Sequence, residues 1–363
     1  EHGNILGKIK RCNKKKLEYL GMTLDYSVDG ELSIDMSDYV KDMIADFKKY
    51  EPNLKTAKTL AAEHLFMVRD NVEKLTEKNA VILAHNYQTP EIYHGVADFS
   101  ADSLALAIEA SKTSADIILM AGVHFMAETA KLMSPDKKVI LPDMDAGCSL
   151  SSSITGKDVR LLKEKYPGVP VVSYVNTSAE VKAETDVCCT SANAVKIVKS
   201  LGVKRVIFLP DDYLAKYVAS QTDVEIISWK GICIVHDQFN KKEIEDIRKN
   251  NPGIKIIAHP ECPPDVIEAS DFAGSTSGMI KYVKDNQPKK VMMVTECSMS
   301  DNVQIDNPNV EFIRPCNLCP HMKKITLPKI LNCLENESNE LVMDDQTIAK
   351  ARKSVERMAE IGR

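Results

Sequence analysis

Three cysteines occupy matching positions in the sequence: Cys148 in VILPDMDAGC, Cys233 in VEIISWKGIC and Cys319 in VEFIRPCNLC. Each stands nine residues past the valine that opens its stretch, and the three recur at intervals of about 85 residues. Thiolates are soft metal ligands, and three of them at one point leave one coordination position open. The pattern predicts zinc, or an iron–sulfur cluster with one iron free of protein that could act as a Lewis acid.

A further cysteine, Cys316, forms a Cys-x-x-Cys pair with Cys319. A zinc ribbon would need a second such pair roughly 15–20 residues away, and the sequence has none. Cys316 falls at the sixth position of the repeated stretch, where the other two stretches have Asp145 and Lys230, which are not soft ligands. We therefore expect Cys319 to be the ligand. A reserve or redox role for Cys316 stays open.

Acid–base side chains end three apolar runs that precede the cysteines, VILAHNYQ, VVSYVNTS and IKIIAHPE. The runs are typical of strands, and His85, Tyr174 and His259 fall at their ends. Glu261 follows two residues after His259. Side chains of these types move protons in catalysis, so the strand ends are candidate catalytic positions.

An aspartate precedes a hydroxyl by five residues in each unit, and the hydroxyl opens an apolar-periodic helix. The pairs are Asp98 with Ser103, Asp186 with Ser191, and Asp271 with Thr276. A helix N-terminus favours an anion, so the hydroxyls predict contacts with phosphate. The run Gly274-Ser275-Thr276 is the best candidate, because glycine lets the backbone approach a ligand closely.

The order of these features predicts an α/β fold made of three homologous small αβα domains, with parallel sheets around a pseudo-threefold axis. The domains would span residues 80–150, 151–235 and 236–330. Residues 1–70 would be an N-terminal extension and 331–363 a C-terminal helical segment. Ligands of open parallel sheets collect at the carboxyl ends of the strands, where the candidate residues lie.

Composition narrows the class of protein further. The chain has 363 residues and a net charge of −5, which does not favour nucleic acid as a partner. No apolar run reaches the roughly 18–20 residues of a membrane span, and we identify no signal peptide. We therefore expect a cytoplasmic protein, in which ten cysteines favour metal or catalytic roles over disulfides.

Several motifs in combination resemble the quinolinate synthase A family over about residues 78–360. They include AHNYQ, ADFSADSLALA, YVNTSAEVKA, AHPEC, GST and CPHMKKITL. The resemblance implies a condensing and dehydrating enzyme with a [4Fe–4S] cluster. It would join iminoaspartate and dihydroxyacetone phosphate to quinolinate, with loss of phosphate and water, in de novo NAD biosynthesis. L-aspartate oxidase or aspartate dehydrogenase would be the partner that supplies iminoaspartate.

The resemblance also implies roles for individual residues. The cluster ligands would be Cys148, Cys233 and Cys319. Glu261 would be the proton-transfer base, assisted by Tyr174, His85 and His259. The substrate-contacting residues would be His85, Tyr87, Ser103, Tyr174, Asn176, Ser191, His259, Glu261, Ser275 and Thr276.

Residues 1–70 carry none of the repeated features. We expect a hairpin with a turn at Asp29-Gly30, followed by a helix. The segment resembles a fragment of a copia-type retroelement polymerase, and we assign it no function.

Two other classes of protein share part of the pattern. An enzyme of the diphthamide-synthase type would need a nucleoside-sized pocket for S-adenosylmethionine. A non-catalytic iron–sulfur or zinc sensor would carry a DNA- or partner-binding element and would not need the histidines, tyrosine and glutamate.

Overall fold

The computed structural model describes residues 16–19, 22–25, 33–35, 79–314 and 317–362. Two compact units divide the chain, Glu1–Asn71 and Val72–Arg363. In the first unit, β1 (Lys16–Tyr19), β2 (Met22–Asp25) and β3 (Ser33–Asp35) form an antiparallel sheet. Strands β2 and β3 pair as the expected hairpin requires, but the Asp29-Gly30 turn and the expected helix lie outside the described residues.

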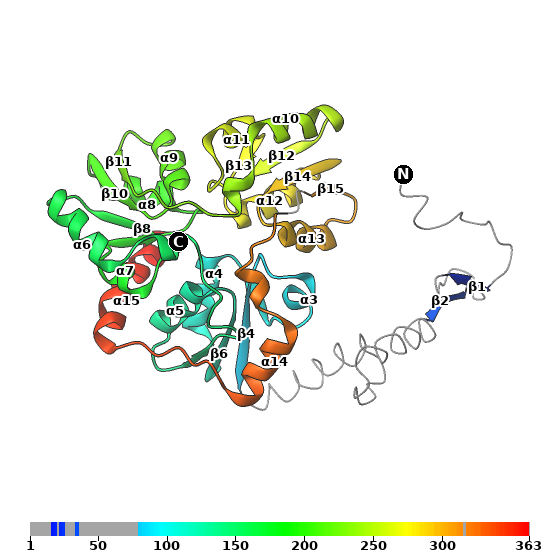
Figure 1. The fold of residues 1–363 in the computed structure, drawn as a ribbon, viewed down its shortest axis with the longest axis horizontal. Helices are drawn as coiled ribbons and strands as arrows, with labels where there is room; N and C mark the ends of the chain where they lie inside the picture. Colours follow the sequence, from blue (N-terminus) through cyan, green and yellow to red (C-terminus); the bar gives the residue numbers. More distant parts are fainter. Residues whose placement is uncertain (1–15, 20–21, 26–32, 36–78, 315–316, 363) are drawn as a thin grey trace. The chain divides into compact units, whose positions relative to one another are not determined.

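The second unit contains three sheets of four parallel strands, grouped about a common centre (Figure 1). The first sheet consists of β4 (Ala80–His85), β5 (Phe99–Ala101), β6 (Ile117–Ala121) and β7 (Lys138–Ile140); the second of β8 (Val171–Tyr174), β9 (Val187–Cys189), β10 (Arg205–Leu209) and β11 (Glu225–Ser228); the third of β12 (Lys255–Ala258), β13 (Phe272–Ala273), β14 (Lys290–Val294) and β15 (Glu311–Ile313). When the strands of each sheet are numbered by their order in the sequence, they lie side by side in the order second, first, third, fourth. The predicted α/β class with parallel sheets is confirmed.

Helices connect the strands at the places that the repeated pattern predicts. The connections are α3 (Pro90–Tyr93), α4 (Ser103–Lys112) and α5 (His124–Met133) in the first unit of the repeat; α7 (Ala179–Ala183), α8 (Ala194–Ser200) and α9 (Asp212–Ser220) in the second; α11 (Pro264–Ala269), α12 (Thr276–Asn286) and α13 (Cys297–Asp306) in the third. The domain boundaries at 150/151 and 235/236 stay a prediction.

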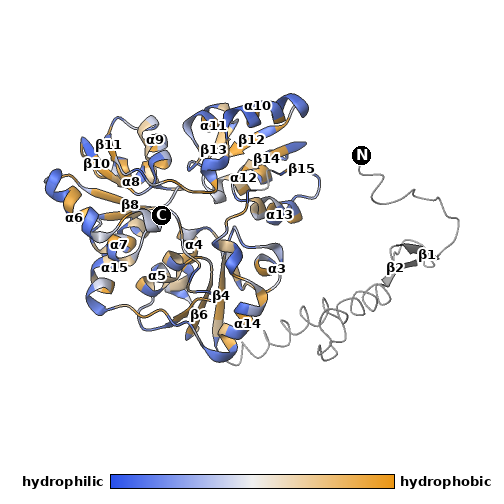
Figure 2. Cartoon of the chain, viewed as in Figure 1, coloured by the Kyte–Doolittle hydropathy of each residue, from blue (hydrophilic) through white to orange (hydrophobic). Residues whose placement is uncertain are grey.

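The central strands are mostly buried, and their exposed or half-buried residues lie at their amino ends, as parallel sheets covered on both faces require. All five residues of β6 are buried. Apolar residues lie along the strands and polar residues on the outer faces of the helices (Figure 2). Burial of each sheet fixes the strand ends, and therefore the side chains that follow them.

The repeated aspartates have a structural role. Each accepts a hydrogen bond from a backbone N–H of the first strand in its sheet: Ile82 to Asp98 at 2.8 Å, Val171 to Asp186 at 2.7 Å, and Ile256 to Asp271 at 2.9 Å. The aspartate therefore accepts from a backbone N–H in the first half of the strand, away from the carboxyl end at which the cavity lies. This bond explains why aspartate recurs at that position.

The C-terminal helix α15 (Asp345–Gly362) packs against α7, β9, α5 and α8, with Ala351, Val355 and Met358 buried. It therefore contacts helices that belong to two different sheets. In the part of the chain that the structure describes, no helix is both long and apolar enough to cross a membrane.

Candidate active site

The same local structure follows each repeated cysteine. A short 3₁₀ helix begins three residues after the cysteine and an α-helix of ten residues begins eight residues after it. The pairs are η2 (Ser151–Ser153) with α6 (Gly156–Lys165), η3 (His236–Gln238) with α10 (Lys241–Asn250), and η4 (Met322–Lys324) with α14 (Leu327–Asn336). The threefold pattern therefore extends beyond the motifs that the sequence revealed.

These turns direct two backbone N–H groups at each sulfur. Burial raises the pKa of the Cys148 thiol to about 12, and hydrogen bonds from the N–H groups of Ser151 and Leu150 act against this. The pKa values of Cys233 and Cys319 are raised by burial in the same way, with the equivalent N–H groups again opposing it. Such N–H groups stabilise sulfur when it carries negative charge.

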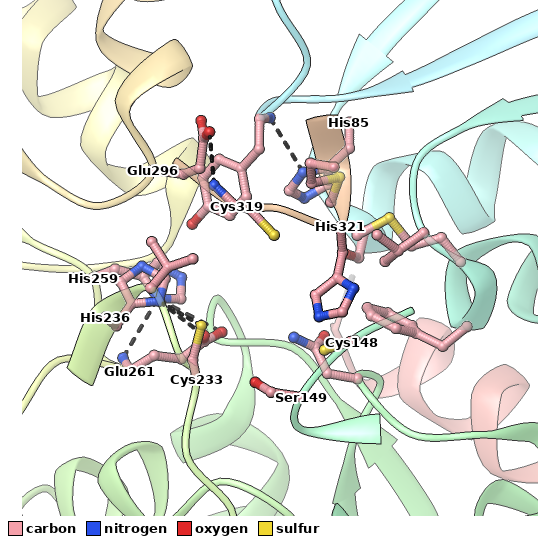
Figure 3. Close-up of a pocket in the computed structure, with 18 of the residues that line it drawn as sticks. His85, Cys148, Ser149, Cys233, His236, His259, Glu261, Glu296, Cys319 and His321 are labelled. Atoms are coloured by element: carbon pink, nitrogen blue, oxygen red, sulfur yellow. Dashed lines mark hydrogen bonds and ion pairs between the residues drawn. The ribbon is translucent and has the colours of Figure 1, made fainter. Parts of the chain in front are cut away.

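All three cysteines line one cavity, where their sulfurs face the same space (Figure 3). The donor set fits a metal–sulfur group, because one thiol comes from each unit and each has N–H groups ready for a thiolate. Metal coordination would also relieve the cost of ionising buried thiols. The cluster itself is treated as a proposal below.

The cavity has about 750 Å³ of empty space, part of it open to solvent. It brings together all but one of the residues that the sequence analysis assigned to the site. Those lining it are His85, Tyr87, Ser103, Cys148, Tyr174, Asn176, Ser191, Cys233, His259, Glu261, Thr276 and Cys319. Ser275 is not among the lining residues, because its hydroxyl caps α12 by accepting from the N–H of Gly278 at 3.1 Å.

The hydroxyls stand at the first turns of helices, with one difference from expectation. Ser103 and Thr276 are the first residues of α4 and α12. Ser191 precedes α8, which begins at Ala194, because the side chain of Asn193 accepts from the N–H of Thr190 and holds residues 190–193 in a turn. The Ser191 hydroxyl instead lies 3.1 Å from Nε2 of His259.

Glu261 is the centre of a buried hydrogen-bond network. Tyr174 donates its hydroxyl proton to Oε1 at 2.5 Å, and Nδ1 of His236 lies 3.1 Å from Oε2. Burial by itself would raise the pKa of Glu261, but His236, His259 and the hydrogen bond from Tyr174 bring that pKa below its usual range. The carboxylate is therefore ionised at neutral pH.

The neighbouring histidines are held neutral. Burial lowers the pKa of His85 to about 4 and that of His259 to about 3, although Glu261 raises both. Burial, followed by the charge of Glu261, raises the pKa of Tyr174 well above its ordinary value. The cavity thus places the ionised Glu261 beside the neutral side chains of His85, His259 and Tyr174 at neutral pH.

Two lysines, the half-buried Lys323 and the fully buried Lys182, hold the loops that follow β4 and β8. Lys323 donates to the carbonyl of Tyr87 at 2.8 Å and pairs with the fully buried Glu296 at 2.9 Å. Lys182, which is 0% exposed, donates to the carbonyls of Val175 and Thr177. These contacts fix the backbone on which Tyr87, Tyr174 and Asn176 stand.

Sequence reasoning missed several side chains of the cavity, above all His236, Glu296 and His321. His236 is 1% exposed and links Cys233, Glu261 and Thr295. The other units have Ser151 and Met322 at the equivalent position, so the repeat gave no signal there. The local spacing Cys233-x-x-His236 could have found it.

Three parallel sheets whose loops direct cysteines, histidines and an ionised carboxylate into one cavity define an α/β enzyme with a thiol-lined centre. A family model described as quinolinate synthetase A protein matches residues 70–360. The chain belongs to this family, the quinolinate synthases.

Individual relatives agree with the family match. Quinolinate synthase 2 of Mesorhizobium japonicum is 61% identical over 282 residues, which cover 78% of this chain and 87% of that protein. The quinolinate synthase of Xylella fastidiosa is 59% identical over 285 residues, covering 78% and 84%. That of Agrobacterium fabrum is 58% identical over 297 residues, covering 81% and 86%.

One solved structure, a solute-binding protein of an ABC transporter from Rhodopseudomonas palustris, aligns with a TM-score of 0.19 and 10% identity. The alignment covers 77% of this chain and 79% of that chain, and a likeness this low carries no argument. Family membership decides against the diphthamide-synthase type and the non-catalytic sensor.

Proposed function

We propose that the chain condenses iminoaspartate with dihydroxyacetone phosphate to give quinolinate, with loss of phosphate and water, in NAD biosynthesis. The observation that carries this proposal is the shared cavity, where one thiol from each unit faces an ionised carboxylate and neutral acid–base groups. Membership of the quinolinate synthase family supports it.

The substrates of this reaction are small anions, and the cavity offers groups suited to them. Ser103 and Thr276 begin α4 and α12, so an anion near them would lie at the positive end of two helix dipoles. Asn176, Ser191 and the neutral His259 add uncharged hydrogen-bonding groups. We assign the phosphate and carboxylates of the substrates to these residues, and Ser275 a supporting role as the cap of α12.

Proton transfer falls to Glu261. Its carboxylate would take a proton from carbon as the two substrates condense, while Tyr174 keeps it oriented through their 2.5 Å hydrogen bond. The neutral imidazole of His85 can donate a proton toward a carbonyl oxygen without adding a second charge to the buried site. Tyr87 lies beside His85, with ring centroids 4.7 Å apart, and limits the motion of that ring.

Cys148, Cys233 and Cys319 would hold a [4Fe–4S] cluster. When bound, such a cluster supplies a Lewis-acidic iron that assists loss of a hydroxyl group as water. L-aspartate oxidase or aspartate dehydrogenase would supply iminoaspartate, and the cytoplasm would be the compartment of the reaction.

The test is anaerobic reconstitution of the full chain with iron and sulfide, followed by assay with iminoaspartate and dihydroxyacetone phosphate. We expect one phosphate released for each quinolinate formed. The Cys148→Ser protein, treated in the same way, is the control and should make neither product. Cluster-loaded protein that releases no phosphate and forms no quinolinate would contradict the proposal.

A further inference from the structure

Three different donor atoms meet on the Cys233 side of the cavity. Sγ of Cys233, a ring nitrogen of His236 and a carboxylate oxygen of Glu261 all lie within 4.8 Å of one another. Nδ1 of His236 is 3.1 Å from Sγ of Cys233 and 3.1 Å from Oε2 of Glu261. Figure 3 shows the three side chains together, while Cys148 and Cys319 approach from other directions.

We propose that Cys233, His236 and Glu261 bind a single zinc ion when the protein carries no iron–sulfur cluster. Thiolate, imidazole and carboxylate are the usual ligands of zinc, and three of them leave the fourth position of a tetrahedral ion open to water. Zinc–ligand distances of about 2.0–2.3 Å place tetrahedral ligand atoms about 3.3–3.6 Å apart. The two 3.1 Å separations need only a small expansion to reach that range.

Outer contacts orient two of the three ligands. Nε2 of His236 lies 2.9 Å from Oγ1 of Thr295 and can donate its proton there, which leaves the lone pair of Nδ1 facing Cys233 and Glu261. Oε1 of Glu261 accepts from Tyr174, which leaves Oε2 for the ion. Zinc-binding histidines and carboxylates ordinarily have such partners, which fix tautomer and direction.

Charge and burial also suit a divalent ion. The side chains of His236 and Glu261 are 1% and 5% exposed. One thiolate and one carboxylate would balance the two charges of zinc, so the filled site would be neutral. The chemistry of the donors excludes magnesium and calcium, which prefer oxygen ligands.

The proposed site shares Cys233 with the cysteine set and Glu261 with the proton-transfer group. Zinc and the cluster would therefore exclude each other, and the zinc-bound protein would be unable to accept a cluster. The part of this consequence that concerns the cluster rests on the proposed function. The zinc site itself does not.

The experiment uses the full chain freed of iron by anaerobic chelation. Cobalt(II), a spectroscopic substitute for zinc, is titrated first and then displaced with zinc. We expect one equivalent of cobalt to give thiolate-to-cobalt absorption with the intense visible bands of a tetrahedral site, and one equivalent of zinc to remove them. Protein that binds no zinc at micromolar concentration would overturn the proposal.

Variants separate this site from a zinc ion on the three cysteines. His236→Gln and Glu261→Gln should each weaken zinc binding more than about 100-fold, and Thr295→Val about 10–100-fold, as outer partners do. Cys148→Ser and Cys319→Ser are the matched controls and should leave zinc affinity within a few-fold. If the two cysteine variants abolish binding while Glu261→Gln preserves it, zinc binds the cysteines and the proposal is wrong.

A second measurement does not depend on any variant. Iron and sulfide are added to wild-type protein with and without one equivalent of zinc, and iron incorporation is followed by absorption. We expect zinc to suppress incorporation until a chelator removes it. If zinc and a full complement of iron bind the same chain together, the proposal is wrong. None of these readouts requires quinolinate formation. A negative result for zinc binding can therefore be told apart from a failure of the proposed function.

Discussion

Glu261 combines deep burial with an ionised state, which a carboxylate keeps only when hydrogen bonds replace water. Tyr174 and His236 supply those bonds from two different units of the repeat. The free energy of the ionised carboxylate therefore depends on the correct arrangement of the units. Small displacements between them would change its basicity.

Removing the charge of Glu261 tests its role. Glu261→Gln keeps the shape of the side chain and removes the base, so turnover should fall about 10²–10⁴-fold while iron and sulfide content stay normal. Steady-state assay of anaerobically reconstituted protein measures this, with Glu268→Gln, at an exposed position of α11, as the control. Turnover within a few-fold of wild type would remove Glu261 from proton transfer.

His85 makes the folded chain sensitive to acid. Burial lowers its folded-state pKa to about 4, while the unfolded chain takes up a proton near the ordinary value of 6.5. Below pH 6.5 the unfolded state therefore binds more protons, so stability is lost progressively as pH falls toward 4. The contribution is up to about 3 kcal/mol.

Denaturant unfolding at pH 7.5, 6.5, 5.5 and 4.5 would measure this loss. His85→Gln should reduce the loss between pH 6.5 and 4.5, whereas substitution of the exposed His94 should leave it unchanged. A wild-type slope retained in His85→Gln would assign the acid sensitivity to other groups.

At the scale of single elements, the Lys323–Glu296 pair connects η4 to the start of α13 and to the loop after β4. Lys323→Met leaves Glu296 buried without its counter-charge, which should cost about 3–5 kcal/mol of unfolding free energy. The exposed pair Lys281–Asp285 offers a control, because Lys281→Met should change stability by no more than about 0.5 kcal/mol. Equal losses in the two variants would contradict a special role for the buried pair.

The turn after each cysteine gives a second prediction at this scale. Cys319 is followed by N–H groups directed at its sulfur, and its position matches Cys148 and Cys233. Cys316 lies outside the described residues, so its role stays a prediction. We expect Cys319→Ser to lose the cluster and Cys316→Ser to keep most of its iron, with the buried Cys333→Ser as control. Iron and sulfide analysis of the variants measures this. Loss of the cluster in Cys316→Ser but not in Cys319→Ser would mean that the matching position of the three cysteines does not identify the ligand.

Repetition explains how much of the site was predictable from sequence. Cys148, Cys233 and Cys319 were found because three units place the same residue type at the same offset, and parallel sheets bring strand ends together. His236 and Glu296 were missed because their types do not recur in all units. Their positions depend on side-chain contacts between segments far apart in the sequence, such as His236 with Thr295, which no local pattern encodes.

At the scale of the whole chain, the match to the family begins at residue 70, and the first compact unit ends at Asn71. Deletion of residues 1–70 should therefore leave cluster content and quinolinate formation largely intact. Iron analysis and the activity assay on the truncated protein check this, with the full chain prepared in parallel. Failure of the shortened chain to stay in solution would show that these residues support the rest of the fold.

The position of α15 has a consequence for the synthesis of the protein. Residues 345–362 leave the ribosome long after α7 and β9, which they cover. The Ser354 hydroxyl donates to the carbonyl of Lys182, so the apolar surface around this buried lysine stays open until α15 has been made. A premature stop codon just before residue 345 would therefore release a chain with every cavity-lining residue present and with α7 and β9 uncovered, a target for chaperones and proteases.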